Sequence, residues 1–93
     1  MTYSVEFLED AKKEWDRLDN PIRQQFSKKL LERRENPLIQ KDKLCGMKDG
    51  YKIKLRSTGY RLVYRVYEQK IVIEVIAVGK RDKEEVYRIA EIR

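Results

Sequence analysis

Strict alternation of apolar and basic side chains in residues 51–56, YKIKLR, is the feature that most constrains this chain. Successive side chains of a strand point to opposite faces, so the apolar odd positions share one face and the basic even positions share the other. Residues 60–66, YRLVYRV, place Leu62, Tyr64 and Val66 on a common face in the same way. We expect a β-hairpin with Ser57-Thr58 as its two-residue turn, although the neighbouring glycine leaves other turns open.

The expected register gathers basic side chains on one face of the hairpin. A two-residue turn pairs Lys54 with Arg61 and Lys52 with Val63, and directly opposed side chains share a face. Five basic residues then project from the same face: Lys52, Lys54, Arg56, Arg61 and Arg65. Opposed like charges destabilise a strand pair, and a polyanion would supply the missing countercharge. We therefore expect this face to bind nucleic acid; the alternative is a solvated basic face with splayed side chains.

The first third of the chain predicts a short strand at residues 2–7 and two helices in a hairpin. Apolar residues within 11–18 recur at helical spacing. Asn20 is a plausible N-cap of the second helix, because Pro21 suits the first helical position. The outer face of this helix carries four basic residues that we interpret as a solvated surface: Lys28, Lys29, Arg33 and Arg34.

The remaining segments complete an α+β domain. Residues 38–50 lack a clear period and predict a loop, residues 71–79 are apolar on both faces as in a central strand, and residues 83–92 predict a short helix. We predict one domain over residues 1–93. It contains an antiparallel-rich sheet of about four strands, an N-terminal helical hairpin on one face, a short C-terminal helix, and a charged face opposite the helices.

Charge and cysteine content limit the setting in which the chain works. A net charge of +6 favours an anionic partner, which is nucleic acid, an anionic membrane surface or an acidic protein. Cys45 is the single cysteine, so no internal disulfide forms, as is typical of a reducing compartment. The N-terminal MTYSVEFLED lacks the regions of a signal peptide, and no apolar run approaches the length of a membrane span. We expect a cytoplasmic protein.

The available side chains exclude several chemistries. The chain has no histidine, which excludes histidine acid–base pairs and disfavours a Cys–His nucleophile. No metal-ligand spacing or glycine-rich phosphate loop is present, so we predict no metal and no cofactor. Lysine, arginine and tyrosine remain, and fixed cations stabilise the charge of a phosphoryl-transfer transition state. RNA supplies its own 2′-OH nucleophile, and a lysine crowded by cations could accept its proton.

Two runs of sequence carry a resemblance to a known family. Residues 43–66, KLCGMKDGYKIKLRSTGYRLVYRV, and residues 75–87, VIAVGKRDKEEVY, closely resemble the RelE toxins of bacterial toxin–antitoxin modules, and AKKEWDRL near the N-terminus also fits. The resemblance covers essentially the whole chain. It implies a RelE/ParE-type fold and a ribosome-dependent endoribonuclease. Such an enzyme would cut mRNA in the ribosomal A site by 2′-OH attack, leaving 2′,3′-cyclic phosphate and 5′-hydroxyl ends.

The resemblance also implies roles for individual residues. Lys52 would transfer a proton, Lys54 and Arg61 would neutralise the phosphate, Arg81 would assist the leaving 5′-oxygen, and Tyr87 would position the nucleotide. Three other basic residues are candidates for RNA or rRNA contacts, with simple solvation as the alternative for the two arginines: Arg56, Arg65 and Lys80.

The partners implied by the resemblance are a RelB-type antitoxin and the ribosome, with its 16S rRNA and A-site mRNA. An acidic, partly disordered antitoxin would bury the cations and could displace the terminal helix. The complex would also repress its own operon, with operator DNA contacted mainly by the antitoxin. Two alternatives stay open: a same-fold toxin that poisons DNA gyrase, and a non-catalytic nucleic-acid-binding module.

Two residues depart from a simple carry-over. Cys45 stands where closely similar RelE toxins have arginine, in a loop expected to meet RNA, so one contact would be lost. Arg81 has the parity of the core-facing positions of strand 71–79. It reaches the basic face only if the strand has ended or if a bulge at Gly79 shifts the alternation.

Overall fold

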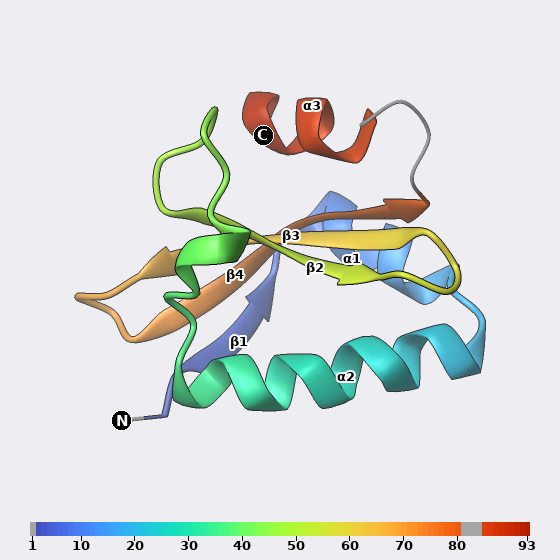
Figure 1. The fold of residues 1–93 in the computed structure, drawn as a ribbon, viewed down its shortest axis with the longest axis horizontal. Helices are drawn as coiled ribbons and strands as arrows, with labels where there is room; N and C mark the ends of the chain where they lie inside the picture. The colour runs from blue at the N-terminus through green and yellow to red at the C-terminus, as the bar shows by residue number, and fades with distance from the viewer. Residues whose placement is uncertain (1, 81–84) are drawn as a thin grey trace.

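The structure is a computed structural model that describes residues 2–80 and 85–93. The elements within these ranges are, in order (Figure 1), β1 (Ser4–Phe7), α1 (Glu9–Asp16), α2 (Asn20–Glu35), the 3-10 helix η1 (Gln40–Asp42), β2 (Gly50–Leu55), β3 (Tyr60–Tyr67), β4 (Val72–Lys80) and α3 (Glu85–Ile92). The described strands form a four-stranded sheet in the order β1-β4-β3-β2. β1 is parallel to β4 and the other pairs are antiparallel. The predicted α+β arrangement is confirmed, and no helix in these ranges is long and apolar enough to cross a bilayer.

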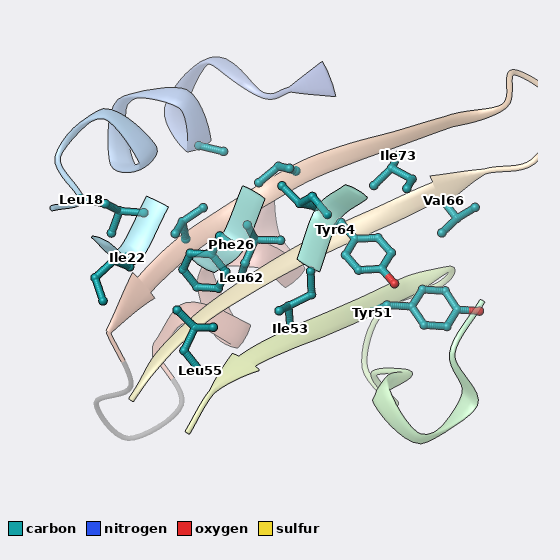
Figure 2. Close-up of a cluster of buried hydrophobic side chains, with 14 residues drawn as sticks. Leu18, Ile22, Phe26, Tyr51, Ile53, Leu55, Leu62, Tyr64, Val66 and Ile73 are labelled. Atoms are coloured by element: carbon teal, nitrogen blue, oxygen red, sulfur yellow. The ribbon is translucent and has the colours of Figure 1, made fainter. Parts of the chain in front are cut away.

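Helices α1 and α2 pack on one face of the sheet and bury its apolar side chains (Figure 2). Ala11 of α1 and Phe26 of α2 belong to one cluster with Ile53, Leu62 and Tyr64 of the sheet, and each of these residues is at most 1% exposed. The apolar faces predicted for β2, for β3 and for both helices therefore meet in this cluster. Burial of a large apolar side chain contributes about 1.5–3 kcal/mol, so this cluster fixes which face of the hairpin turns inward.

The start of α2 differs from the prediction by one residue. Asp19, with extended backbone angles of φ −66° and ψ 151°, is the N-cap, and Asn20 is already the first residue of the helix. Pro21 is therefore the second helical residue in place of the predicted first, still within the first turn. A proline is tolerated in the first helical turn because the N–H groups there have no helical acceptor, so its position does not decide which neighbour caps the helix.

The predicted hairpin register is confirmed, but the turn is longer than predicted. Lys54 pairs with Arg61 in the ladder between β2 and β3, which ends at the pair Leu55–Tyr60. The loop therefore comprises residues 56–59 in place of a two-residue turn. The Gly59 N–H donates a hydrogen bond to the Leu55 carbonyl at 2.8 Å, and its φ of 80° lies in the left-handed region that glycine adopts without strain.

A register shift in β4 changes which residues face the helices. Val63 pairs with Ala77, whereas the next residue, Tyr64, pairs with Val75, so Ile76 is an extra residue in β4. Odd-numbered positions after Ile76 therefore lie on the opposite face from odd-numbered positions before it.

This register shift affects the sequence prediction for Arg81, whose parity was assigned from strict alternation along the strand. The sequence leaves two possibilities, an end of the strand before Arg81 or a bulge at Gly79, and the structure places a bulge earlier, at Ile76. β4 then continues to Lys80. Arg81 itself lies outside the described residues.

Helix α3 covers part of the second sheet face, which the sequence predicts to be charged (Figure 1). Val86 and Ala90 of α3 form a second buried cluster with Met47, Val63 and Ala77. A wholly charged face opposite the helices is therefore wrong: the centre of this face is apolar, and basic residues lie around it. The physical reason is that residues 71–79 are apolar on both faces, and each face needs a cover to exclude water.

Tyr64 joins three parts of the fold through its buried hydroxyl. It donates a hydrogen bond to the Pro37 carbonyl at 2.7 Å and accepts one from Nη1 of Arg33 at 2.7 Å. The other guanidinium nitrogen of Arg33 pairs with Asp42 of η1 at 2.6 Å. Burial raises the pKa of Tyr64 to about 12, although the Arg33 hydrogen bond acts to lower it.

We expect Tyr64→Phe to lower the free energy of unfolding by about 1–3 kcal/mol, because it leaves buried polar partners unpaired. Urea denaturation measures this loss. Tyr67→Phe is the matched control, since its hydroxyl contacts Glu74 in a partly exposed position and the carboxylate can bind water instead. Equal losses in the two variants would contradict the role assigned to Tyr64.

Stability should also fall as the pH rises from 10 to 12. The unfolded Tyr64 ionises near pH 10, whereas the folded residue keeps its proton to about pH 12. The unfolded state therefore binds fewer protons in this window, which costs about 1.4 kcal/mol per pH unit for this group. Comparison of wild type with Tyr64→Phe in alkaline denaturation isolates this contribution, and parallel pH profiles would contradict it.

Candidate active site

The basic pair predicted from the hairpin is present at the exposed end of β2 and β3. Lys54 is exposed and lies directly opposite Arg61, and Lys52 is half-buried opposite Val63. Directly opposed residues of an antiparallel pair have Cβ atoms about 4.5–5.5 Å apart. The ladder therefore holds two cationic side chains next to each other on the face that carries α3.

Arg61 is the charged residue whose environment is most unusual among the described positions. It is only 8% exposed, and its Nε has no hydrogen-bond partner within residues 2–80 and 85–93. Burial of a guanidinium with an unpaired donor is costly, because the group loses water and gains no acceptor. An anion beside the part of the guanidinium that remains exposed would supply the missing countercharge.

Tyr87 of α3 covers Arg61. Its hydroxyl oxygen lies 3.4 Å from Nη1 of Arg61, and the guanidinium carbon lies 5.7 Å from the centroid of the ring. A cation at this distance from an aromatic face is attracted by the ring quadrupole. The contact therefore fixes the guanidinium and places a phenol beside it, although the two residues are far apart in sequence.

The end of α3 is held by an ion pair on the other side of the helix. The guanidinium of Arg93 donates to both carboxylate oxygens of Glu14, at 3.0 and 2.8 Å, and to the Ile76 carbonyl at 2.8 Å. Glu14 also accepts a hydrogen bond from the Val78 N–H at 3.0 Å. The hydrogen bond to Glu14 raises the pKa of Arg93. This contact joins α1, β4 and α3, and so supports the helix that carries Tyr87.

The predicted site residues divide into those that the fold brings together and those that it separates. Lys52, Lys54, Arg61 and Tyr87 lie at one end of the hairpin face. Arg65 is on the same face but lies four residues along β3, opposite Glu74, and so has a carboxylate beside it.

Two further candidates lie elsewhere. Lys80 pairs with Tyr60, whose ring packs against the cluster under α1 and α2, so Lys80 lies on that side of the sheet. Arg56 is exposed in the hairpin loop. The candidate Arg81 cannot be placed, because it falls outside the described residues.

The loop that contains Cys45 lies close to α3. Cys45 itself is an exposed free thiol. A Cβ on the adjacent Gly46 would lie 2.6 Å from a carboxylate oxygen of Glu91, so the backbone approaches the helix closely there. Within the described residues, no group of three or more histidine, cysteine, aspartate and glutamate side chains lies close enough to hold a metal ion.

A basic groove lies beside Lys52 and Lys54, and the sequence did not predict it. It has a volume of about 840 Å³ and lies between α2, η1 and β2, with Lys29, Lys41, Lys52 and Lys54 among its lining residues. The basic residues on α2 were the sequence signal for this groove. The interpretation of these residues as a solvated surface is wrong in part, because two of them bond to other parts of the fold. Arg33 is bonded as described above, and Nε of Arg34 donates to the Tyr3 carbonyl at 2.8 Å.

The chain is similar in sequence and in fold to known proteins. Residues 5–85 match the family described as "ParE toxin of type II toxin-antitoxin system". The chain is 55% identical over 87 residues to the mRNA interferase toxin RelE of Escherichia coli K12, covering 94% of this chain and 92% of that protein. A free-state mutant structure of E. coli toxin RelE superimposes with a TM-score of 0.90 at 53% identity, covering 97% of this chain and 95% of the other. RelE in the intact E. coli RelBE toxin–antitoxin complex gives a TM-score of 0.84 at 53% identity, covering 87% of this chain and 99% of the other.

We expect Arg93→Ala to loosen α3. The pair is mostly buried, with 18% and 24% of the two side chains exposed, so removal of Arg93 leaves Glu14 without its cation and should cost about 1–3 kcal/mol. Hydrogen exchange of the α3 amides should become faster than in the wild type, while exchange in the central strands changes less. Arg88→Ala removes an exposed side chain from the same helix, and it should change neither the free energy of unfolding nor the exchange rate of the α3 amides. Unchanged exchange in Arg93→Ala would contradict this anchoring role.

Proposed function

This chain belongs to the RelE/ParE family of type II toxins, and from that premise we propose that it is an mRNA interferase of the RelE kind, a toxin that acts as an endoribonuclease in the cytoplasm. The observation that carries the proposal is the buried Arg61 guanidinium, with an unpaired Nε, fixed beside Lys54 in the strand ladder. Preorganised cations of this kind stabilise the charge that develops on a phosphate during transfer. We further propose that residues 1–93 act as one domain.

The proposed reaction needs only groups that the RNA and this chain provide. The 2′-oxygen attacks the adjacent phosphorus and loses its proton, with Lys52 as the proton acceptor. The bond from phosphorus to the 5′-oxygen breaks, and that oxygen takes up a proton with the assistance of Arg81. The products are a 2′,3′-cyclic phosphate and a 5′-hydroxyl. Lys54 and Arg61 neutralise the nonbridging oxygens, where negative charge accumulates in the transition state.

Tyr87 is proposed to position the nucleotide that carries the 2′-hydroxyl. Its ring already lies over the Arg61 guanidinium, and its hydroxyl is next to the same group. A base can stack on such a ring, and the hydroxyl can contact the sugar or the phosphate. The absence of histidine from the chain makes lysine and tyrosine the available groups for proton transfer and hydrogen bonding.

The proposed partners follow from the same premise. The E. coli relative of this chain occurs in a complex with the antitoxin RelB. We propose that a RelB-type antitoxin inhibits this chain by neutralising its cations and displacing α3 with Tyr87. We also propose that the toxin acts on A-site mRNA in the ribosome, in contact with 16S rRNA. The toxin–antitoxin complex would repress its operon through antitoxin contacts with operator DNA.

Poisoning of DNA gyrase is the second candidate function, because the matching family is described by its ParE toxin. Such a toxin needs no cluster of phosphate-neutralising residues. The 55% identity to an mRNA interferase over nearly the whole chain favours RNA cleavage. A gyrase supercoiling assay separates the two, since the interferase should leave supercoiling unchanged at concentrations that stop translation.

We expect Lys54→Ala and Arg81→Ala each to reduce cleavage by at least roughly 10²-fold, because each removes a cation that the transition state requires. Primer extension on mRNA in programmed ribosomes, with the A-site codon in place, measures the cuts. Lys12→Ala is the control for loss of one positive charge, since Lys12 pairs with Asp16 on α1. Full cleavage by both site variants would contradict the proposed reaction. Weaker ribosome binding in the site variants, with no cleavage by the wild type at saturating toxin, would favour a non-catalytic module.

A further inference from the structure

We propose that the groove between α2, η1 and β2 is a second RNA-binding site, which holds backbone phosphates next to the one that is cleaved. The inference rests on the proposed function, since it takes RNA as the ligand. Its two distinctive residues are Lys29 on α2 and Lys41 on η1, neither of which belongs to the proposed catalytic set. They lie on separate elements and line the same groove.

The charge of the groove matches a polyanion. Six of its lining residues are basic and two are acidic. One of the acidic residues, Asp42, is already paired with Arg33 at 2.6 Å, with 17% and 15% of the two side chains exposed. The remaining lining residues therefore leave a clear positive excess. A concave surface of one charge concentrates the electrostatic potential and attracts an oppositely charged strand.

The groove is also held in shape before any ligand arrives. Arg33 contacts Tyr64 of β3, Asp42 of η1 and the main-chain carbonyl of Lys52 in β2, the last at 3.3 Å. One side chain of α2 thus connects this helix to the other two walls of the groove, η1 and β2, and to β3 beneath them. Lys41, adjacent to Asp42, is presented from a wall that this connection fixes. A preorganised site loses less entropy on binding than one that must form around its ligand.

The groove continues directly from the proposed catalytic cluster. Lys52 and Lys54 line it from the edge of β2, and Lys54 also lies opposite Arg61 on the sheet face. A strand whose scissile phosphate lies between Lys54 and Arg61 can therefore pass over the edge of β2 and enter the groove. Its neighbouring phosphates would then meet Lys29 and Lys41.

The contacts of β2 favour RNA over a peptide that adds to the sheet as a strand. Strand addition needs a run of main-chain groups on the outer edge. At Lys52 the carbonyl already accepts a hydrogen bond from Arg33, and Tyr51 is bridged to Lys43. A peptide strand would have to displace these contacts along the first half of β2, whereas phosphate recognition uses the lysine side chains and leaves the contacts intact.

The test compares two double variants that lose the same charge. Lys29→Ala/Lys41→Ala removes the groove lysines, whereas Lys28→Ala/Lys70→Ala removes exposed lysines from the same helix and from the distant turn between β3 and β4. Single-turnover cleavage on programmed ribosomes is measured over toxin and KCl concentrations. We expect the groove variant to raise the half-saturating toxin concentration roughly tenfold, with the maximal rate within about twofold of wild type. Its logarithmic salt slope should become shallower by about 1.4, or about 0.7 per lost phosphate contact. The control should show neither change, and Lys29→Arg/Lys41→Arg should keep wild-type binding.

A second arm identifies the source of the phosphates. Ribosome binding is repeated with mRNA that ends before the A site. A tenfold loss that persists supports an rRNA strand in the groove, and a loss that disappears supports mRNA.

The outcomes separate failure of this inference from failure of the proposed function. Equal half-saturation and salt slope for the groove and control variants, with wild-type cleavage intact, would overturn the inference alone. Unchanged cleavage together with weaker binding of a RelB-type antitoxin to the groove variant alone would overturn it in favour of a protein ligand. Absence of cleavage by wild-type toxin would instead reject the proposed function.

Discussion

The register between β2 and β3 is the constraint on which the candidate site depends. It aligns the buried side chains Ile53 and Leu62 under the helices, and a slip by one residue would move the apolar side chains of one of the two strands to the opposite face. The same register forces Lys54 to lie opposite Arg61 on the other face. An exposed lysine and a buried arginine with charges about 4 Å apart repel by about 4 kcal/mol at an effective dielectric constant near 20. Each large buried apolar side chain contributes about 1.5–3 kcal/mol, and β2 and β3 bury several of them. Core packing therefore outweighs the repulsion and holds the cations together.

Helix α3 turns this cationic pair into a site with defined geometry. Its apolar residues pack on the centre of the sheet face, and Tyr87 lies over Arg61 at the edge of that contact. The burial of Arg61 is a consequence, because the helix and the sheet remove water from it together. The Arg93–Glu14 pair holds the other end of the helix. A partner that lifts α3 would therefore expose an apolar surface and separate Tyr87 from Arg61 in one step.

Periodicity predicted most of the architecture, and its errors occur where periodicity carries no information. The strand positions, the pairing of Lys54 with Arg61, and the apolar faces of the hairpin and of helices α1 and α2 are confirmed. The predicted two-residue turn and the predicted N-cap Asn20 were wrong, because neighbouring residues have similar preferences for turn and capping positions. A bulge was one of two possibilities, placed at Gly79, and the structure has it at Ile76, where residues 75–79 contain no polar residue to mark the change of face.

The sequence by itself determined the chemistry that this chain has available: a hairpin with one basic face, no histidine, and cations as the groups that can meet a phosphate. These follow from side-chain identity and from the two-residue period of a strand. Only the tertiary structure decided that α3 covers the apolar centre of the second sheet face, that Arg61 is buried beneath Tyr87, and that α2, η1 and β2 enclose a groove lined by Lys29 and Lys41. Each of these features joins residues far apart in the chain, and their proximity results from packing that no local pattern encodes.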